Sequence, residues 1–146
     1  MTNDSNVDFD QSNSEILHDS ALDLATLYEF MTQATAPKIK QKWGHTVTVD
    51  KSTRRIDFAI NTPAKLILIE TNFYSGGGSK LKSTAGEYRT LYQCLKSDGH
   101  QFIWITDGAG WRTTQRPLEE TFNETDYILN LDMLEKKILE ELIKCH

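Results

Sequence analysis

Two acidic residues in the middle of the chain have the spacing and setting of a divalent-metal site. Asp57 lies in the stretch RRIDFAI, and Glu70 follows the apolar run LILI. If these stretches form antiparallel strands joined by the turn NTPAK, the two carboxylates lie side by side and repel each other unless a cation neutralises them. Mg²⁺ suits one or two carboxylates, polarises phosphate and lowers the pKa of a bound water. The alternative is that Asp57 faces solvent and an arginine neutralises Glu70.

A glycine loop and two lysines follow Glu70 directly. The N-terminus of a helix favours an anion, and the ammonium groups of Lys80 and Lys82 would reinforce this preference. Glycines let a backbone approach DNA closely, although a three-glycine run is as often a flexible loop. We expect at least one lysine to contact phosphate or to catalyse, the alternative being a solvated helix start. The predicted DNA-binding residues of this segment are Tyr74, Ser75, Gly76, Gly77, Gly78, Lys80 and Lys82.

Basic residues are concentrated in the middle of the chain. Residues 38–96 carry eleven Lys and Arg against four Asp and Glu, although the net charge of the whole chain is −5. Such a distribution permits contact with a polyanion on one face. Arg54 and Arg55 are predicted to bind DNA: one of them reads guanine or binds phosphate, and the other pairs with an acid. The alternating lysines of KIKQK would point one way in an extended segment, as phosphate contacts or as a charged loop.

Several classes of protein do not fit the composition. No apolar run approaches the roughly 18 residues of a membrane-spanning helix, so no membrane partner is expected. The polar, acidic N-terminus is unlike a signal peptide, and Cys94 and Cys145 lack metal-ligand spacing, as in a protein of the reducing cytoplasm. The four histidines also lack ligand spacing, and no Ser-His-Asp or Cys-His set is evident.

The hydrophobic pattern predicts the elements that must position these residues. Residues 1–18 are expected to be a disordered acidic tail, and residues 19–146 one domain. Pro37 is expected to end the first helix. A helix between a central strand and the next strand favours a mixed α/β sheet with helices on both faces. The predicted helices are 20–34, 80–96 and 132–144, and the predicted strands are 46–49, 54–60, 65–72, 101–106 and 126–131.

On these residues the chain resembles the PD-(D/E)XK nucleases. Asp57 and Glu70-Thr71-Asn72 take the places of that motif, except that Asn72 stands where the motif usually has lysine. Four longer segments are similar to type II restriction endonucleases of the DpnII/MboI kind, from about Phe30 to Leu134. These segments are KQKWGHTVTVDKSTRRIDFAI, LILIETNFYSGGGSKLKSTAGEY, FIWITDGAGW and RPLEETFNETDYILNLDML.

The resemblance implies a restriction-endonuclease-like core that cleaves double-stranded DNA at GATC sites with Mg²⁺. Asp57, Glu70 and the carbonyl of Thr71 would hold the metal, and Asn72 would hold the attacking water. Lys80 or Lys82 would supply positive charge. The expected catalytic site thus consists of the Thr71 carbonyl and the side chains of Asp57, Glu70, Asn72, Lys80 and Lys82. A palindromic target implies a homodimer.

Two other functions remain open at this point. Family enzymes are longer than this chain, with a helical region upstream of the core. One alternative is therefore that the chain is a cleavage-deficient DNA-binding or regulatory relic of the same core. A more distant alternative is a structure-specific nuclease of the resolvase or repair type.

Overall fold

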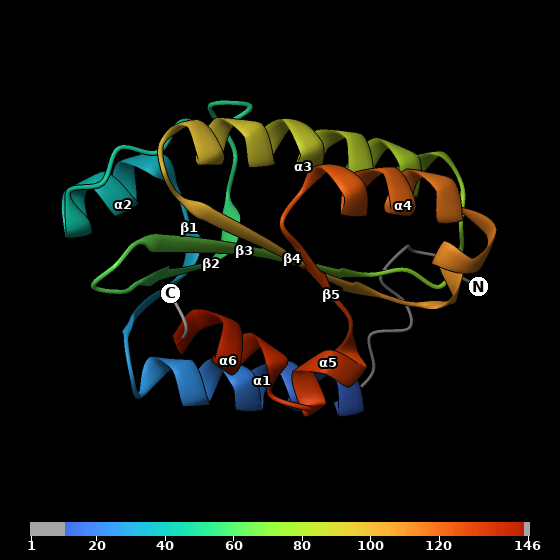
Figure 1. The fold of residues 1–146 in the computed structure, drawn as a ribbon, viewed down its shortest axis with the longest axis horizontal. Coiled ribbons are helices and arrows are strands. Elements are labelled where there is room, and N and C mark those ends of the chain that lie inside the picture. Colours follow the sequence, from blue (N-terminus) through green and yellow to red (C-terminus); the bar gives the residue numbers. More distant parts are fainter. Residues whose placement is uncertain (1–10, 145–146) are drawn as a thin grey trace.

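Five strands form one mixed sheet that lies between two layers of helices (Figure 1). The computed structural model describes residues 11–144. No helix in that range is both long and apolar enough to cross a membrane. In chain order, the elements are α1 (Gln11–Ala25), β1 (Glu29–Ala34), α2 (Ala36–Trp43), β2 (Ile56–Asn61), β3 (Leu66–Phe73), α3 (Ser79–Ser97), β4 (Gln101–Asp107), the 3₁₀ helix η1 (Ala109–Thr113), α4 (Gln115–Glu124), β5 (Tyr127–Leu129), α5 (Leu131–Glu135) and α6 (Ile138–Lys144).

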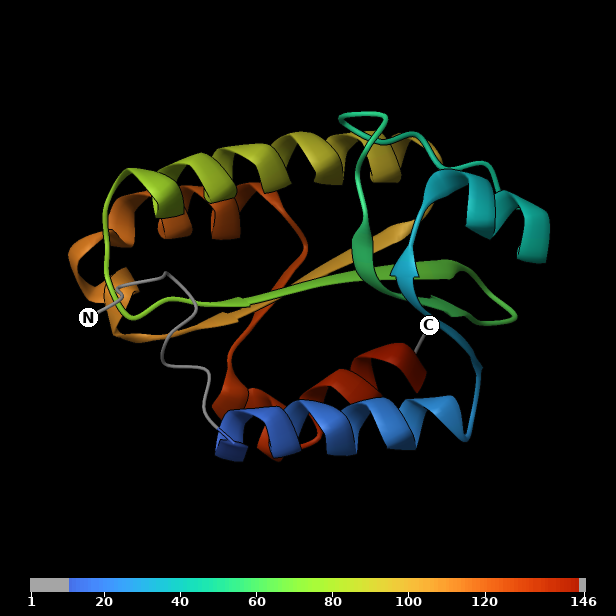
Figure 2. The ribbon, with the colours of Figure 1, turned by 180° about the vertical axis from the view of Figure 1, so that it is seen from behind.

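The order of the strands in the sheet follows their order in the chain. Strands β1, β2 and β3 pair antiparallel, whereas β4 pairs parallel to β3 and β5 parallel to β4. Helix α3 makes the crossover from β3 to β4, as parallel neighbours require. Helices α2, α3 and α4 lie on one side of the sheet, and α1, α5 and α6 lie on the other (Figures 1 and 2). The predicted α/β class with a mixed central sheet is confirmed.

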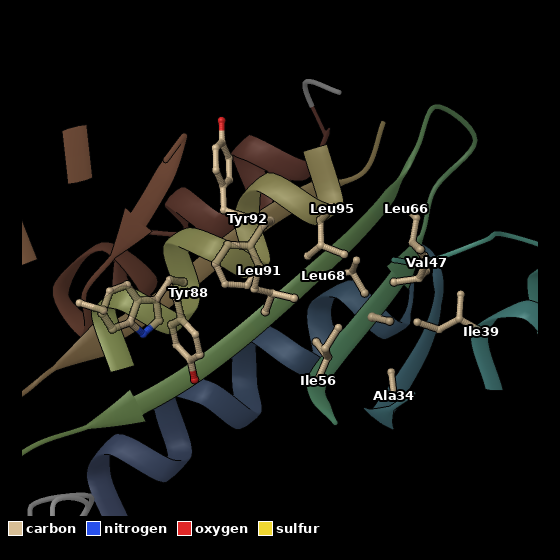
Figure 3. Close-up of a cluster of buried hydrophobic side chains, with 14 of the residues drawn as sticks. Ala34, Ile39, Val47, Ile56, Leu66, Leu68, Tyr88, Leu91, Tyr92 and Leu95 are labelled. Carbon is tan, nitrogen blue, oxygen red and sulfur yellow. The ribbon is translucent and has the colours of Figure 1, made fainter. Parts of the chain in front are cut away.

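The central strand β3 is covered on both faces, which explains its nearly continuous apolar sequence. Leu66 and Leu68 belong to a buried cluster beneath α3 that also includes Leu91 and Leu95 (Figure 3). Ile67 and Ile69 point the other way, into a second cluster that α1, α5 and α6 close. Since Glu70 shares the alternation of Leu66 and Leu68, its carboxylate faces α3.

The N-terminal part of the fold differs from the sequence-based prediction. Residues 1–10 of the predicted tail lie outside the described range, but residues 11–18 form the start of α1 rather than a disordered segment. Helix α1 also ends at Ala25, so the predicted helix 20–34 is wrong in its second half. Residues 29–34 instead form β1, which pairs with β2 along the edge of the sheet. Glu29, expected on that helix, begins this strand.

Pro37 begins a helix instead of ending one. Thr35 caps α2, its side chain accepting a hydrogen bond from the Lys38 N–H, and the proline occupies the first turn. Proline lacks a backbone N–H, and this costs nothing there because N–H groups in the first turn of a helix have no partner within the helix. The lysines of KIKQK therefore lie on a helix, in which successive residues are rotated by about 100°, so the three side chains do not all point one way. Residues 46–49, predicted as a strand, are irregular.

Other boundaries are close to those expected. The predicted helix 80–96 and strand 65–72 match α3 and β3 to within one residue at each end. The predicted C-terminal helix is broken into α5 and α6 at Lys137, which has a φ of 62°. Helix α4 was not predicted.

Candidate active site

The two predicted metal ligands lie next to each other where β2 begins beside β3. The Asp57 N–H donates to Glu70 Oε1 at 3.0 Å, and the Thr71 N–H donates to Asp57 Oδ2 at 2.9 Å. The Thr71 hydroxyl donates to the same Asp57 oxygen at 3.2 Å. The antiparallel register, in which Phe58 pairs with Ile69, brings the two carboxylates together. Each acid thus accepts a hydrogen bond from the backbone of the other strand.

Arg54 lies inside this acidic site. Its side chain is 9% exposed and contacts Asp50 at 2.6 Å, Glu87 at 2.9 Å and Glu70 at 3.4 Å. The hydrogen bonds that Arg54 donates to Asp50 and then to Glu87 raise its pKa, and the charge of Glu70 adds to this, so the guanidinium stays charged. Of the two arginines predicted to bind DNA, Arg54 is therefore the one that pairs with acids, while Arg55 is exposed.

Glu70 is a buried acid with excess negative charge around it. The residue is 3% exposed. Burial, and then the neighbouring charge of Asp57, raise the pKa of Glu70 to about 8, even though Arg54 acts in the opposite direction. A divalent cation between the two carboxylates would favour their ionised forms. In the described range no group of three or more His, Cys, Asp or Glu residues is arranged to hold a metal. Two carboxylates are nevertheless enough for a divalent cation such as Mg²⁺, which completes its shell with backbone oxygens and water.

Asn72 is fixed by hydrogen bonds at both ends of its amide. Trp104 Nε1 donates to Asn72 Oδ1 at 2.9 Å, and Asn72 Nδ2 donates to Tyr88 Oη at 3.0 Å. The Asn72 amide, which is predicted to hold the attacking water, is thus already oriented by two aromatic residues. Sequence reasoning missed both partners, because Trp104 and Tyr88 fit the apolar patterns of a buried strand and a helix stripe.

The glycine loop is packed on one side and open on the other. The Gly110 N–H donates to the Tyr74 carbonyl at 2.9 Å, and the Gly78 N–H donates to Thr114 Oγ1 at 3.1 Å. A Cβ at Gly77 would overlap Thr113, Thr114 and the Gly110 carbonyl, whereas a Cβ at Gly76 or Gly78 would meet no atom. The η1 segment therefore supports one side of this loop.

The other predicted DNA-binding residues differ in exposure. Lys80 and Lys82 are exposed in the first turn of α3, whose N-cap residue Gly78 provides no side-chain hydrogen bond. Ser75 is half-buried. Tyr74 is 3% exposed and its hydroxyl donates to Thr84, so its ring is part of the core. The structure thus keeps the lysines available to a ligand but not the Tyr74 ring.

Comparisons with known proteins identify the family of this chain. The family model described as DpnII restriction endonuclease matches residues 7–141. The chain belongs to the DpnII restriction endonuclease family. It is 54% identical over 119 residues to the type II restriction enzyme MjaIII of Methanocaldococcus jannaschii, covering 79% of this chain and 41% of that protein.

Two bacterial type II restriction enzymes are also similar to this chain. The type II restriction enzyme LlaDCHI of Lactococcus lactis subsp. cremoris is 47% identical, with 80% of this chain and 40% of that protein covered. The type II restriction enzyme DpnII of Streptococcus pneumoniae is 43% identical, with 66% and 34% covered. The matched part of the chain thus spans about two fifths or less of the length of these relatives.

Proposed function

We propose that this chain is, or is part of, a Mg²⁺-dependent type II restriction endonuclease that cleaves double-stranded DNA at GATC sites. The observation that carries the proposal is the pairing of Asp57 and Glu70, each of which accepts a hydrogen bond from the backbone of the other's strand. The named activity of the relatives supports the same conclusion. Because the proposed substrate is DNA, we also infer a cytoplasmic location.

In this proposal Asp57, Glu70 and the carbonyl of Thr71 hold the metal. Mg²⁺ bound there would polarise the phosphate and lower the pKa of a water molecule. The water oxygen attacks phosphorus and releases a proton to the solvent, and the bond from phosphorus to the 3′-oxygen breaks. The 3′-oxygen takes up a proton, so the products are a 3′-hydroxyl and a 5′-phosphate. Asn72, held by Trp104 and Tyr88, positions the attacking water.

DNA would approach the open side of the glycine loop. Gly76 and Gly78 leave room for a phosphate backbone there, and Lys80 and Lys82 add positive charge at the start of α3. Arg55 is the exposed arginine beside the site, and it takes the DNA-binding role that Arg54 cannot fill. Because GATC is palindromic, we expect two copies of the protein to bind it with two-fold symmetry.

A specific observation favours a second candidate, a DNA-binding relic that does not cut. Arg54 occupies Glu70 Oε2 at 3.4 Å, which leaves that oxygen less available to a metal. Such a relic would bind GATC duplexes without cleaving them in Mg²⁺.

Cleavage of a plasmid carrying GATC sites separates these functions, with Mg²⁺ or EDTA present. We expect cutting only with Mg²⁺, and only at GATC. Asp57→Ala and Glu70→Ala should abolish cutting while DNA binding survives or tightens, because a charge that repels phosphate is removed. Cutting by either variant at the parental rate would contradict the metal assignment. Binding without cutting by the parent would support the relic, and preference for branched DNA would indicate a repair enzyme.

A further inference from the structure

We propose that the Tyr88 hydroxyl is a catalytic hydrogen-bond donor to a non-bridging oxygen of the scissile phosphate. This inference rests on the proposed function and adds a residue to that site. Tyr88 lies on α3 with its hydroxyl directed toward β3, whereas the hydroxyl of Tyr92, one turn along, points away from the sheet (Figure 3).

The direction of the hydrogen bonds around Asn72 is fixed by chemistry. The indole nitrogen of Trp104 can only donate, so the Asn72 atom that it contacts at 2.9 Å must be the carbonyl oxygen. The NH₂ group of Asn72 therefore faces Tyr88, and it donates to Tyr88 Oη at 3.0 Å. A phenol that accepts from an NH₂ group cannot direct its own proton at that group. The Tyr88 proton must point elsewhere.

No protein group within residues 11–144 receives that proton. Tyr88 is 7% exposed, and its hydroxyl donates to no acceptor among the described residues. Buried polar groups in folded proteins are nearly always hydrogen-bonded. The Tyr88 hydroxyl meets this rule as an acceptor from Asn72, which leaves its proton available to a ligand oxygen. The three aligned groups, Trp104, Asn72 and Tyr88, thus form a chain of donors that ends in a free O–H.

The Tyr88 side chain shares Arg54 as a neighbour with the acidic pair. The Arg54 guanidinium is 5.8 Å from the centre of the Tyr88 ring, and the same guanidinium contacts Glu70 at 3.4 Å. Asn72, which holds the hydroxyl, is two residues after Glu70 and faces the same side of β3. A phosphate attracted to a cation held by Asp57 and Glu70 would present acceptor oxygens to this donor. A neutral donor aimed at those oxygens stabilises the charge that builds up on them during attack.

Tyr88→Phe tests this role because the ring has a separate packing function. The ring makes edge-to-face contacts with Trp104 and Phe102, at centroid distances of 4.9 and 5.8 Å. Phenylalanine keeps both contacts and removes the hydroxyl, which is also the acceptor of the Asn72 NH₂ group, while Trp104 still holds the Asn72 carbonyl. Tyr92→Phe is a matched control on the same helix, since Tyr92 donates to Asp126 at 3.0 Å and accepts from Lys96 at 3.1 Å.

Single-turnover cutting of a GATC duplex in Mg²⁺ is the first measurement. Tyr88→Phe should cut roughly ten- to a thousandfold more slowly, the range for loss of one donor to a developing charge. Circular dichroism at the assay temperature should show that it is folded. Tyr92→Phe should cut at the parental rate. The inference is overturned if Tyr88→Phe cuts at the parental rate, or if both variants slow equally.

If the parental protein does not cut, the proposed function is refuted. DNA affinity in Mg²⁺ then tests the role of the Tyr88 hydroxyl separately. Loss of a hydrogen bond to a charged oxygen should weaken the binding of Tyr88→Phe to the duplex by roughly tenfold. Tyr92→Phe should bind like the parent. Equal affinities of the parent and Tyr88→Phe would overturn the role of the hydroxyl.

Discussion

At the scale of single residues, Arg54 keeps several acids close together in a small volume. It is the shared partner of Asp50, Glu70 and Glu87, and its side chain is 9% exposed. Removing one member of a buried charge network leaves the others uncompensated, which costs more than the network contributes when intact. Arg54 therefore allows Glu70 to remain buried when no metal is bound, although the pKa of Glu70 at about 8 indicates incomplete compensation.

Arg54→Ala should lower the free energy of unfolding by about 3 kcal/mol, as for other broken buried ion pairs. Its exposed neighbour provides the control: Arg55→Ala should change stability by about 0.5 kcal/mol or less. Urea unfolding in EDTA measures both. Mg²⁺ should raise the thermal midpoint of Arg54→Ala more than that of the parent, because a bound cation would replace the lost charge. An equal response to Mg²⁺ would argue against a metal between Asp57 and Glu70.

The acidic pair could be predicted from the sequence, whereas its aromatic support could not. Asp57 and Glu70 are recognisable because a short turn between two strands fixes which residues lie opposite each other. Tyr88 and Trp104 are 16 residues apart in sequence and meet only because α3 folds back over β3 and β4. Their apolar surroundings predict core residues, which they also are. Nothing in their spacing distinguishes a tyrosine whose hydroxyl is used from one that is only packed.

At the scale of elements, the loops after β3 and β4 form one packed unit. The Tyr74 N–H donates to the Asp107 carbonyl at 3.0 Å, and the Gly110 N–H donates back to the Tyr74 carbonyl at 2.9 Å. Asp107 also accepts from the Leu131 N–H at 3.0 Å, which ties the end of β4 to the start of α5. The position of the glycine loop, and with it the start of α3, thus depends on the TDGAG segment.

Gly110 and Gly76 face each other across this contact and provide a matched pair of substitutions. A Cβ at Gly110 would overlap the backbone of Gly76, whereas a Cβ at Gly76 would meet no atom. Gly110→Ala should therefore lower the free energy of unfolding by about 1–3 kcal/mol, as overpacking does. It should also slow cutting, because the loop carrying Lys80 must shift. Gly76→Ala should leave stability unchanged to within about 0.5 kcal/mol. Equal losses in thermal unfolding would show that the two loops are not packed in this way.

Elements with local signals were predictable, and those defined by distant partners were not. Helix α3 has a regular apolar stripe and a clear stop, and β3 is an apolar run between turns. Strand β1 carries Tyr28, Phe30 and Met31 in or beside it, a pattern that also fits a helix. It is extended because β2 offers it a free edge, and pairing along an edge outweighs local preference. Pro37 was misread because the same residue ends one helix and begins another.

At the scale of the whole molecule, the basic middle of the sequence does not form one basic face. Helix α2 lies near the C-terminal end of α3, while the glycine loop and the first turn of α3 lie at the opposite end of the molecule (Figures 1 and 2). Lys80 and Lys82 belong to the second region, and Lys38 and Lys42 to the first. All four lysines are exposed. Only the pair beside the glycine loop is placed to share a phosphate backbone with the acidic site.

Replacing either lysine pair by glutamine removes the same two charges, so the two double variants differ only in where the charge is lost. Each phosphate contact contributes about 0.9 to the slope of log affinity against log salt concentration. The Lys80→Gln/Lys82→Gln variant should therefore lose about 2 from that slope, and it should bind every duplex more weakly, whatever its sequence. The Lys38→Gln/Lys42→Gln variant should keep the parental slope. Its charges lie near the far end of α3, and this helix of 19 residues, at about 1.5 Å per residue, is much longer than the screening length of about 10 Å. Fluorescence anisotropy of a labelled GATC duplex over a salt series measures both slopes. If the slope falls equally in the two variants, DNA wraps along the whole of α3, and the glycine loop is not the main phosphate contact.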